Sequence, residues 1–175
     1  MNLKLKRTPG IFLVGFMGSG KTTIGRELAY ELGWSFVDTD EDIETAEGMG
    51  IFEIFDKRGE PEFRRLEHAA IQKRVRVIQT GRPMVVALGG GAYAQQDNFE
   101  LIENNGLSVW LDCPLAVARS RVEAFAQRPL ARDPEKFAHL YFARRASYQR
   151  ADFRVENAGN DIKSAVSAIL ALPIF

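Results

Sequence analysis

A glycine-rich loop near the start of the chain restricts its fold more than any other feature. Residues 15–22 read Gly-Phe-Met-Gly-Ser-Gly-Lys-Thr, which fits G-x-x-x-x-G-K-[S/T], between an apolar run at 11–16 and a helical pattern at 21–32. Glycines let the backbone curl so that N–H groups point at phosphate oxygens, and the following helix directs its positive end at the same anion. We predict a nucleotide-binding loop in which Lys21 reaches the β- and γ-phosphates and the Thr22 hydroxyl ligates Mg²⁺. The alternative, a strand-to-helix turn without a ligand, is disfavoured by this context.

Short apolar runs alternate with helical patterns along the rest of the chain, without a repeat or a linker. This order indicates one α/β domain over residues 1–175, with a parallel sheet covered by helices on both faces. Such sheets bind ligands at the carboxyl ends of their strands. Strands are expected at 11–16, 35–37, 84–88, 107–113 and 153–155, and helices at 21–32, 40–47, 51–57, 61–77, 99–105, 115–125, 135–150 and 161–172.

The composition excludes several classes of protein. The 175 residues are 46% hydrophobic and 26% charged, as in ordinary globular domains, and Lys+Arg and Asp+Glu both number 23. A net charge of zero disfavours a nucleic-acid partner, and no stretch approaches the roughly 18 apolar residues of a membrane span. Cys113 is the single cysteine, so no internal disulfide can form, and we expect a cytoplasmic protein.

Two carboxylates, Asp38 and Asp40, follow the second expected strand. Alternation along an extended segment places both on the same side, so that one can face a metal and the other an acceptor hydroxyl. A helix N-cap at Asp40 is the alternative, because Glu41 and Asp42 follow it at a helix start. Beside a phosphate loop the catalytic interpretation is favoured, since in-line phosphoryl transfer needs metal support and an oriented nucleophile.

Paired arginines on two expected helices, Arg64 with Arg65 and Arg144 with Arg145, indicate an anionic acceptor. Planar guanidinium groups bind carboxylates through two parallel hydrogen bonds. Surface ion pairing, as between Glu60 and Arg64, is the alternative, and spacing alone favours it.

Three glycines, Gly89, Gly90 and Gly91, end the third expected strand. Many P-loop enzymes carry an acidic metal ligand at this place, whereas here the tip has no side chains. Close approach of the backbone to a ligand is the natural use of such a tip, with a loose turn as the alternative. We therefore expect backbone contact with a ligand here.

Taken in order, these motifs resemble those of the shikimate kinases. The resemblance covers nearly the whole chain, from the glycine loop to about Glu156, and its most specific part is GEPEFRRLE followed by LGGGA. It implies a three-layer α/β/α P-loop kinase with a five-stranded parallel sheet, a helical substrate-binding region at about 38–67 and a mobile lid at about 126–136. The segments that carry it are GFMGSGKTTIG, FVDTD, IFEIFDKRGEPEFRRLE, ALGGGA, RPLA and FARRASYQR.

The activity implied by the resemblance is transfer of the ATP γ-phosphoryl group to the 3-hydroxyl of shikimate, with Mg²⁺. Shikimate 3-phosphate and ADP would be the products, in aromatic amino acid biosynthesis. We expect a monomer whose partner is the small molecule shikimate, with no nucleic acid and no membrane.

Roles for individual residues are also implied by the resemblance. Lys21, Asp40 and Arg128 would be catalytic, with Asp40 either orienting the hydroxyl or taking its proton. Thr22 and Asp38 would hold Mg²⁺, Asp38 through water. The nucleotide would be bound by Gly18, Ser19, Gly20, Lys21, Thr22, Thr23 and the lid residue Arg128. Shikimate would be bound by Asp40, Phe55, Phe63, Arg64, Gly89, Gly90, Gly91 and Arg145, with Arg64 and Arg145 on its carboxylate.

Two segments depart from the family pattern. The lid reads Arg-Pro-Leu-Ala at 128–131, where the family usually has Arg-Pro-Leu-Leu, and residues 157–160 leave the adenine contact unassigned, with Asn160 as a candidate. Two other functions stay open at this point. A gluconate kinase of the same fold would not require the FRR, GGG and RRASY segments together, and a nucleotide-gated regulatory module would be expected to have lost acids or arginines.

Overall fold

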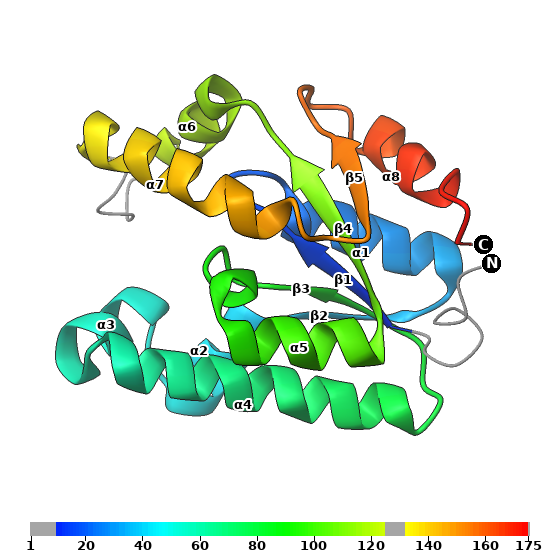
Figure 1. The fold of residues 1–175 in the computed structure, drawn as a ribbon, viewed down its shortest axis with the longest axis horizontal. Helices are drawn as coiled ribbons and strands as arrows, with labels where there is room; N and C mark the ends of the chain where they lie inside the picture. The colour runs from blue at the N-terminus through cyan, green and yellow to red at the C-terminus, as the bar shows by residue number, and fades with distance from the viewer. Residues whose placement is uncertain (1–9, 125–131, 175) are drawn as a thin grey trace.

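The central element is a parallel sheet of five strands in the order β2-β3-β1-β4-β5 (Figure 1). This computed structural model describes residues 10–124 and 132–174. All four strand pairings are parallel, as the alternation of strands and helices predicts. The strands are β1 (Gly10–Val14), β2 (Ser35–Asp38), β3 (Met84–Ala87), β4 (Leu107–Asp112) and β5 (Phe153–Glu156).

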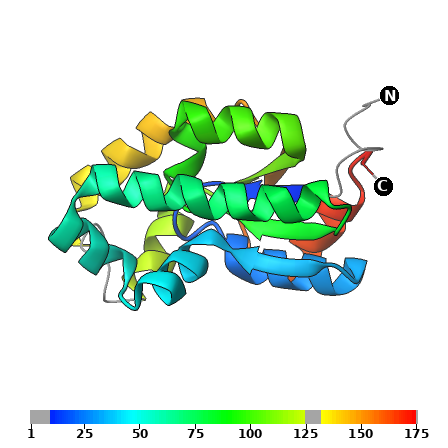
Figure 2. The ribbon, with the colours of Figure 1, turned by 90° about the horizontal axis from the view of Figure 1, so that it is seen from below.

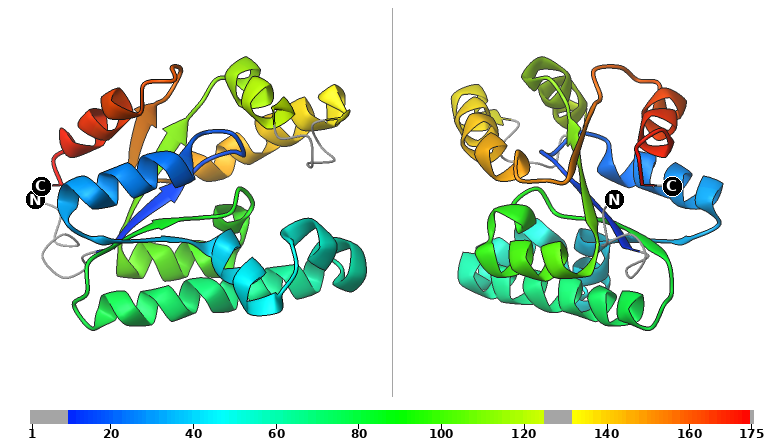
Figure 3. Two further views of the ribbon diagram at one scale, coloured as in Figure 1. Left: turned by 180° about the vertical axis from the view of Figure 1, so that it is seen from behind. Right: turned by 45° about the vertical axis from the view of Figure 1, so that its right-hand side comes forward.

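Helices cover both faces of this sheet, which gives three layers. One face carries α1 (Lys21–Leu32) and α8 (Ile162–Leu170), and the other carries α4 (Glu60–Gln79), α5 (Gln96–Asn105) and α7 (Pro134–Tyr148); Figure 3 shows the two groups on opposite sides. Two shorter helices, α2 (Thr39–Glu47) and α3 (Ile51–Arg58), lie at one end of α4 (Figure 2). The remaining elements are α6 (Leu115–Glu123) and the 3-10 helix η2 (Ala92–Ala94).

Burial on both faces explains why β1 is a continuous apolar run rather than an alternating one. Phe12 and Val14 belong to the core beneath α4, α5 and α7, whereas Ile11 and Leu13 belong to the core beneath α1 and α8. Successive side chains of a strand point to opposite faces, so each layer receives every second residue of β1.

The strand order places a ligand-binding crevice at the carboxyl end of β1. β1 pairs with β3 on one side and with β4 on the other, so the chain winds away from it in both directions. The crevice of an open parallel sheet lies at such a reversal. The loops after β1, β2, β3 and β4, which carry most of the expected site residues, therefore meet at one edge.

The element boundaries differ from the sequence-based expectation by a few residues at most. β1 ends at Val14, two residues early, and η2 was not expected. Asp161 caps α8 as predicted, since its side chain accepts a hydrogen bond from the backbone N–H of Ser164. Residues 126–131 of the expected lid lie outside the described residues. No helix among 10–124 and 132–174 is long and apolar enough to cross a membrane.

Candidate active site

The glycine loop joins β1 to α1 and lies at the predicted edge of the sheet. Gly18 has φ +78°, and a Cβ there would lie 2.6 Å from the carbonyl oxygen of Ala118, so only glycine fits. The N-cap of α1 is Gly20, and no side chain hydrogen bonds to the first turn. The positive end of α1 is thus available to an anion in the loop. Ser19 is fully buried, and Thr23 is exposed on the first turn of α1.

Lys21 lies folded over this loop. Its Nζ donates hydrogen bonds to the carbonyl oxygens of Gly15, at 2.8 Å, and Phe16, at 2.9 Å. The ammonium group is therefore held at the rim of the loop, in the position from which a lysine can reach phosphate oxygens.

Asp38 and Thr22 meet where β2 ends and α1 begins. The Thr22 hydroxyl donates to Oδ2 of Asp38 at 2.6 Å, and Oδ1 of Asp38 accepts hydrogen bonds from the backbone N–H groups of Asp40 and Glu41. Asp38 is thus the N-cap of α2. The structure corrects the expected local geometry: α2 starts at Thr39, so Asp38 and Asp40 do not share an extended segment, and the capping residue is not Asp40.

Thr39 fixes the turn between these two acids. It is fully buried, its hydroxyl donates to the carbonyl oxygen of Ala87, and it accepts a hydrogen bond from the backbone N–H of Gly89, each at 3.3 Å. The start of α2 is therefore bonded directly to the glycine turn after β3. No pattern in the sequence marks Thr39 as a site residue.

The glycine turn is crowded by side chains on one side. A Cβ on Gly89 would lie 2.7 Å from Oδ1 of Asp40 and 3.1 Å from Oε2 of Glu67. A Cβ on Gly91 would lie 2.6 Å from Nη2 of Arg64 and 3.0 Å from Nη2 of Arg144. Because these glycines have no side chains, two carboxylates and two guanidinium groups can approach the same short segment of backbone.

Glu67 is the buried acid of this cluster. It is 1% exposed, and its Oε1 accepts a hydrogen bond from Nη1 of Arg64 at 2.8 Å. Its Oε2 has no hydrogen-bond partner among the described residues. Burial raises the pKa of Glu67 above its ordinary value, and the positive charge of Arg64 partly opposes this.

Arg145 does not lie with Arg64. Its guanidinium donates to both carboxylate oxygens of Asp112, at 2.7 and 3.2 Å, on the side of β4. The neighbouring Arg144 lies at the glycine turn instead, where a Cβ on Gly90 would be 3.4 Å from its Nη1. Adjacent residues of a helix point about 100° apart, so a sequence with two consecutive arginines does not reveal which of them faces the site.

An aromatic pair lines the same end of the site. The rings of Phe55 and Phe63 are 4.4 Å apart between centroids, and the Arg64 guanidinium lies 5.3 Å from the centroid of Phe63. On the opposite side, the Tyr148 hydroxyl donates to the carbonyl oxygen of Gly90 at 2.5 Å. Burial raises the pKa of Tyr148 to about 12, so this hydroxyl remains a donor at neutral pH.

The glycine turn lies next to the phosphate loop. A Cβ on Gly90 would lie 3.6 Å from the backbone nitrogen of Met17 and 3.8 Å from the carbonyl oxygen of Gly15. A group bound beside the glycine turn is therefore adjacent to a phosphate bound in the loop.

The far side of the phosphate loop is bounded by α6 and by the segment after β5. Arg121 donates to the carbonyl oxygens of Gly18, at 2.9 Å, and Gly159, at 2.5 Å. The Asn157 amide donates to the carbonyl oxygen of Ser19 at 2.7 Å. Nη2 of Arg121 also donates to Oδ1 of Asn160, at 3.5 Å. Arg121 is not part of a recognisable motif, and the sequence offered no signal for it.

The sequence of the chain matches one protein family over most of its length. The family described as "Shikimate kinase" matches residues 17–172. The chain belongs to the shikimate kinase family. A relative from Persephonella marina, called shikimate kinase, is 39% identical to this chain over 161 residues. The match covers 91% of this chain and 96% of the relative.

Solved structures agree with the family assignment. The shikimate kinase from Acinetobacter baumannii in complex with shikimate has a TM-score of 0.86 and 34% identity, covering 94% of this chain and 92% of that one. A gluconokinase from Sinorhizobium meliloti has a TM-score of 0.61 at 19% identity, covering 94% of this chain and 91% of that one. At that identity the likeness concerns the fold alone.

Proposed function

We propose that this chain transfers the γ-phosphoryl group of ATP to the 3-hydroxyl of shikimate, giving shikimate 3-phosphate and ADP. Family membership supports the substrate class. The observation that carries the proposal is the closeness of the two loops: a Cβ placed on Gly90 would lie 3.6 Å from the backbone nitrogen of Met17 and 3.8 Å from the carbonyl oxygen of Gly15. A carboxylate-bearing acceptor held there has its hydroxyl next to the terminal phosphate, as in-line transfer requires.

The nucleotide is proposed to bind through residues 18–23, with its phosphates against the backbone N–H groups of the loop and the first turn of α1. Lys21 would leave its carbonyl partners for the β- and γ-phosphates. It would then stabilise the negative charge that the equatorial oxygens carry in the transition state.

Mg²⁺ is proposed to bind at Thr22 and Asp38. A hydroxyl and a carboxylate held 2.6 Å apart at the edge of the phosphate loop are the hard oxygen donors that this ion prefers. The ion, when bound, would neutralise charge on the phosphate oxygens. The two side chains would hold it in place, and Asp38 would do so while also capping α2.

Shikimate is proposed to bind through its carboxylate to Arg64 and Arg144, and not to Arg145. Arg64 and Arg144 converge on Gly91, whereas both carboxylate oxygens of Asp112 engage Arg145. Phe55 and Phe63 would pack against the ring of the acceptor. Gly90 would present its backbone at the floor of the pocket, with its carbonyl group held by Tyr148.

Asp40 is proposed to bind the 3-hydroxyl. Its carboxylate lies beside Gly89, the first residue of the glycine turn. As the hydroxyl oxygen forms its bond to phosphorus and the bond to the ADP oxygen breaks, Asp40 would orient the hydroxyl and accept its proton.

The remaining parts of the proposal rest on the sequence. Arg128 is the first residue of the Arg-Pro-Leu-Ala segment at 128–131 and lies outside the described residues. It is proposed to reach the nucleotide phosphates. We also propose a cytoplasmic monomer that acts on a small molecule, without a nucleic-acid or membrane partner. Gel filtration against standards tests the monomer.

A coupled assay of ADP release tests the proposed reaction. We expect ADP to appear with ATP, Mg²⁺ and shikimate together, and to fall to background when gluconate replaces shikimate. Lys21→Ala should lower kcat by about a hundredfold or more. Equal ADP release with gluconate, or without any acceptor, would refute the proposal.

A further inference from the structure

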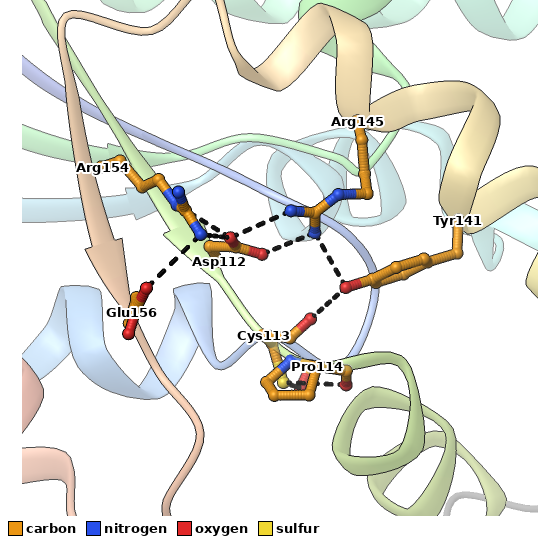
Figure 4. Close-up of polar contacts among 8 residues, drawn as sticks. Asp112, Cys113, Pro114, Tyr141, Arg145, Arg154 and Glu156 are labelled. Carbon is orange, nitrogen blue, oxygen red and sulfur yellow. Dashed lines mark hydrogen bonds and ion pairs between the residues drawn. The ribbon is translucent and has the colours of Figure 1, made fainter.

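A buried carboxylate with two arginine partners lies at the end of β4, outside the residues assigned above. Asp112 is the last residue of that strand, and its side chain is 8% exposed. Arg145 of α7 donates to it through Nη1 and Nη2, and Arg154 of β5 donates through Nε at 2.8 Å (Figure 4). Two consecutive elements, α7 and β5, are thus joined to β4 through one acid.

An indole ring lies beside both arginines. The Trp110 ring centroid is 4.9 Å from the guanidinium carbon of Arg145 and 5.2 Å from that of Arg154. Buried ion pairs contribute little net stability, because desolvation offsets most of their attraction, and their best-attested use is to fix geometry. The cluster is therefore better explained by what it positions than by the stability it adds.

Arg145 is also bonded along α7 to Tyr141. Its Nη1 donates to the Tyr141 hydroxyl at 2.9 Å, and that hydroxyl donates to the carbonyl oxygen of Cys113 at 2.7 Å (Figure 4). The Tyr141 ring also meets the ring of Phe16, in the phosphate loop, edge to face at 5.3 Å between centroids. One face of α7 is thus attached to the end of β4 and to the phosphate loop.

The same turns of α7 carry two residues that face the acceptor pocket. Arg144 lies at Gly90 and Gly91, and the Tyr148 hydroxyl donates to the carbonyl oxygen of Gly90. Arg145 lies between them in sequence and points to Asp112. Any rotation or sliding of α7 that breaks the bond to Asp112 therefore also moves Arg144 and Tyr148 relative to the glycine turn.

We propose that Asp112 and Arg145 form a positioning pair, which holds α7 where Arg144 and Tyr148 meet the acceptor. This inference rests on the proposed function. Arg145 touches neither substrate: it acts through α7. Bidentate recognition of a carboxylate tolerates little displacement, so a small shift of α7 weakens acceptor binding while the nucleotide end is left largely intact.

The rival explanation is that Arg145 itself binds the acceptor carboxylate and rests on Asp112 only when the pocket is empty. The two explanations differ in the effect of Asp112→Asn. If Arg145 is a direct ligand, weakening its hold on Asp112 releases it and leaves acceptor binding unchanged or tighter. If the pair positions α7, the same substitution weakens acceptor binding.

The test is steady-state kinetics with ATP and shikimate varied separately, on Arg145→Gln, Asp112→Asn and the double variant. We expect each single variant to raise the KM for shikimate about tenfold, with the KM for ATP within about twofold of the parent. The double variant should be little worse than either single one, because both remove the same contact. Arg145→Lys, which keeps the charge but loses the planar fork, should restore part of the binding.

Arg154→Gln is the matched control. Arg154 pairs with the same carboxylate from β5, is 52% exposed and does not belong to α7. We expect its KM for shikimate to stay within about twofold of the parent, whatever its effect on the melting temperature. Tighter or unchanged shikimate binding in Asp112→Asn, or equal increases in both KM values in Arg145→Gln, would overturn the positioning pair. A parent protein that releases no ADP with shikimate would instead refute the proposed function.

Discussion

The hydroxyl of Thr22 donates a 2.6 Å hydrogen bond to Oδ2 of Asp38. This bond joins the first residues of α1, which follow the phosphate loop, to the last residue of β2. The other oxygen of Asp38 caps α2, on which Asp40 lies. One carboxylate thus connects the proposed metal site to the residue proposed to bind the acceptor hydroxyl.

Asp38→Asn should raise the Mg²⁺ concentration needed for half-maximal activity by about tenfold or more, because the neutral amide holds a cation less well. The fold should be kept, since asparagine is also a good N-cap. Titration of ADP release with Mg²⁺ at saturating ATP and shikimate measures the change. Glu41→Gln, which removes an exposed charge from the same helix, is the control and should leave the Mg²⁺ dependence as it is.

Alanine at Gly91 and at Gly89 should impair different steps. A Cβ on Gly91 collides with Arg64 and Arg144, so Gly91→Ala should raise the KM for shikimate. A Cβ on Gly89 collides with the carboxylate of Asp40, so Gly89→Ala should lower kcat. Steady-state kinetics separates the two effects. Gly50→Ala is the control, because the nearest atom to a Cβ there is 3.7 Å away. The same change in kcat and in the KM for shikimate in all three variants would contradict this account.

Arg64→Gln and Arg144→Gln should each weaken shikimate binding by about 2–5 kcal/mol, with little effect on ATP binding. The reason is that each removes one charge-assisted partner of the carboxylate and leaves that carboxylate partly unpaired. Titration calorimetry with shikimate measures the loss. Arg65→Gln is the control on the same helix, since Arg65 is 66% exposed and pairs with Glu62. Tight binding of a shikimate amide by the parent would show that Arg64 and Arg144 do not recognise a carboxylate.

Most of the fold could be predicted because its signals are local. Gly33, in a left-handed conformation, ends α1 where predicted. Strand β4 ends at Asp112, one residue before the predicted end at Cys113. The glycine loop between β1 and α1 is also predicted from residue type and spacing, whereas the geometry after Asp38 is not, because α2 starts at Thr39. Each of the predicted features depends on neighbours within a few positions in the sequence.

The parts of the site that sequence analysis missed depend on contacts between distant segments. Thr39 matters because it bonds to Ala87 and Gly89, and Arg121 because it bonds to Gly18 and Gly159. Neither contact leaves a periodic pattern in the sequence. The choice between Arg144 and Arg145 depends on the rotation of α7 about its axis, which Asp112 on β4 helps to fix.

Glu67→Gln should make the stability of the fold less dependent on pH. Burial raises the pKa of Glu67 above 4.5, more than the nearby charge of Arg64 lowers it. The folded state therefore binds this proton more tightly than the unfolded state does. The stability that Glu67 contributes is fully present below about pH 4.5 and is lost as the pH rises through the raised pKa. Glutamine does not titrate, so the variant lacks this loss.

Thermal unfolding of both proteins from about pH 4 to about pH 8 measures the effect. The melting temperature of Glu67→Gln minus that of the parent should increase with pH across the window and level off above the raised pKa of Glu67. Glu62→Gln is the matched control on the same helix: a hydrogen bond from Arg65 lowers the pKa of Glu62, and its side chain is partly exposed. The melting temperature of Glu62→Gln minus that of the parent should not increase over the same pH range. A constant difference for Glu67→Gln would mean that Glu67 titrates alike in the folded and unfolded chain, and that Arg64 fully offsets the cost of its burial.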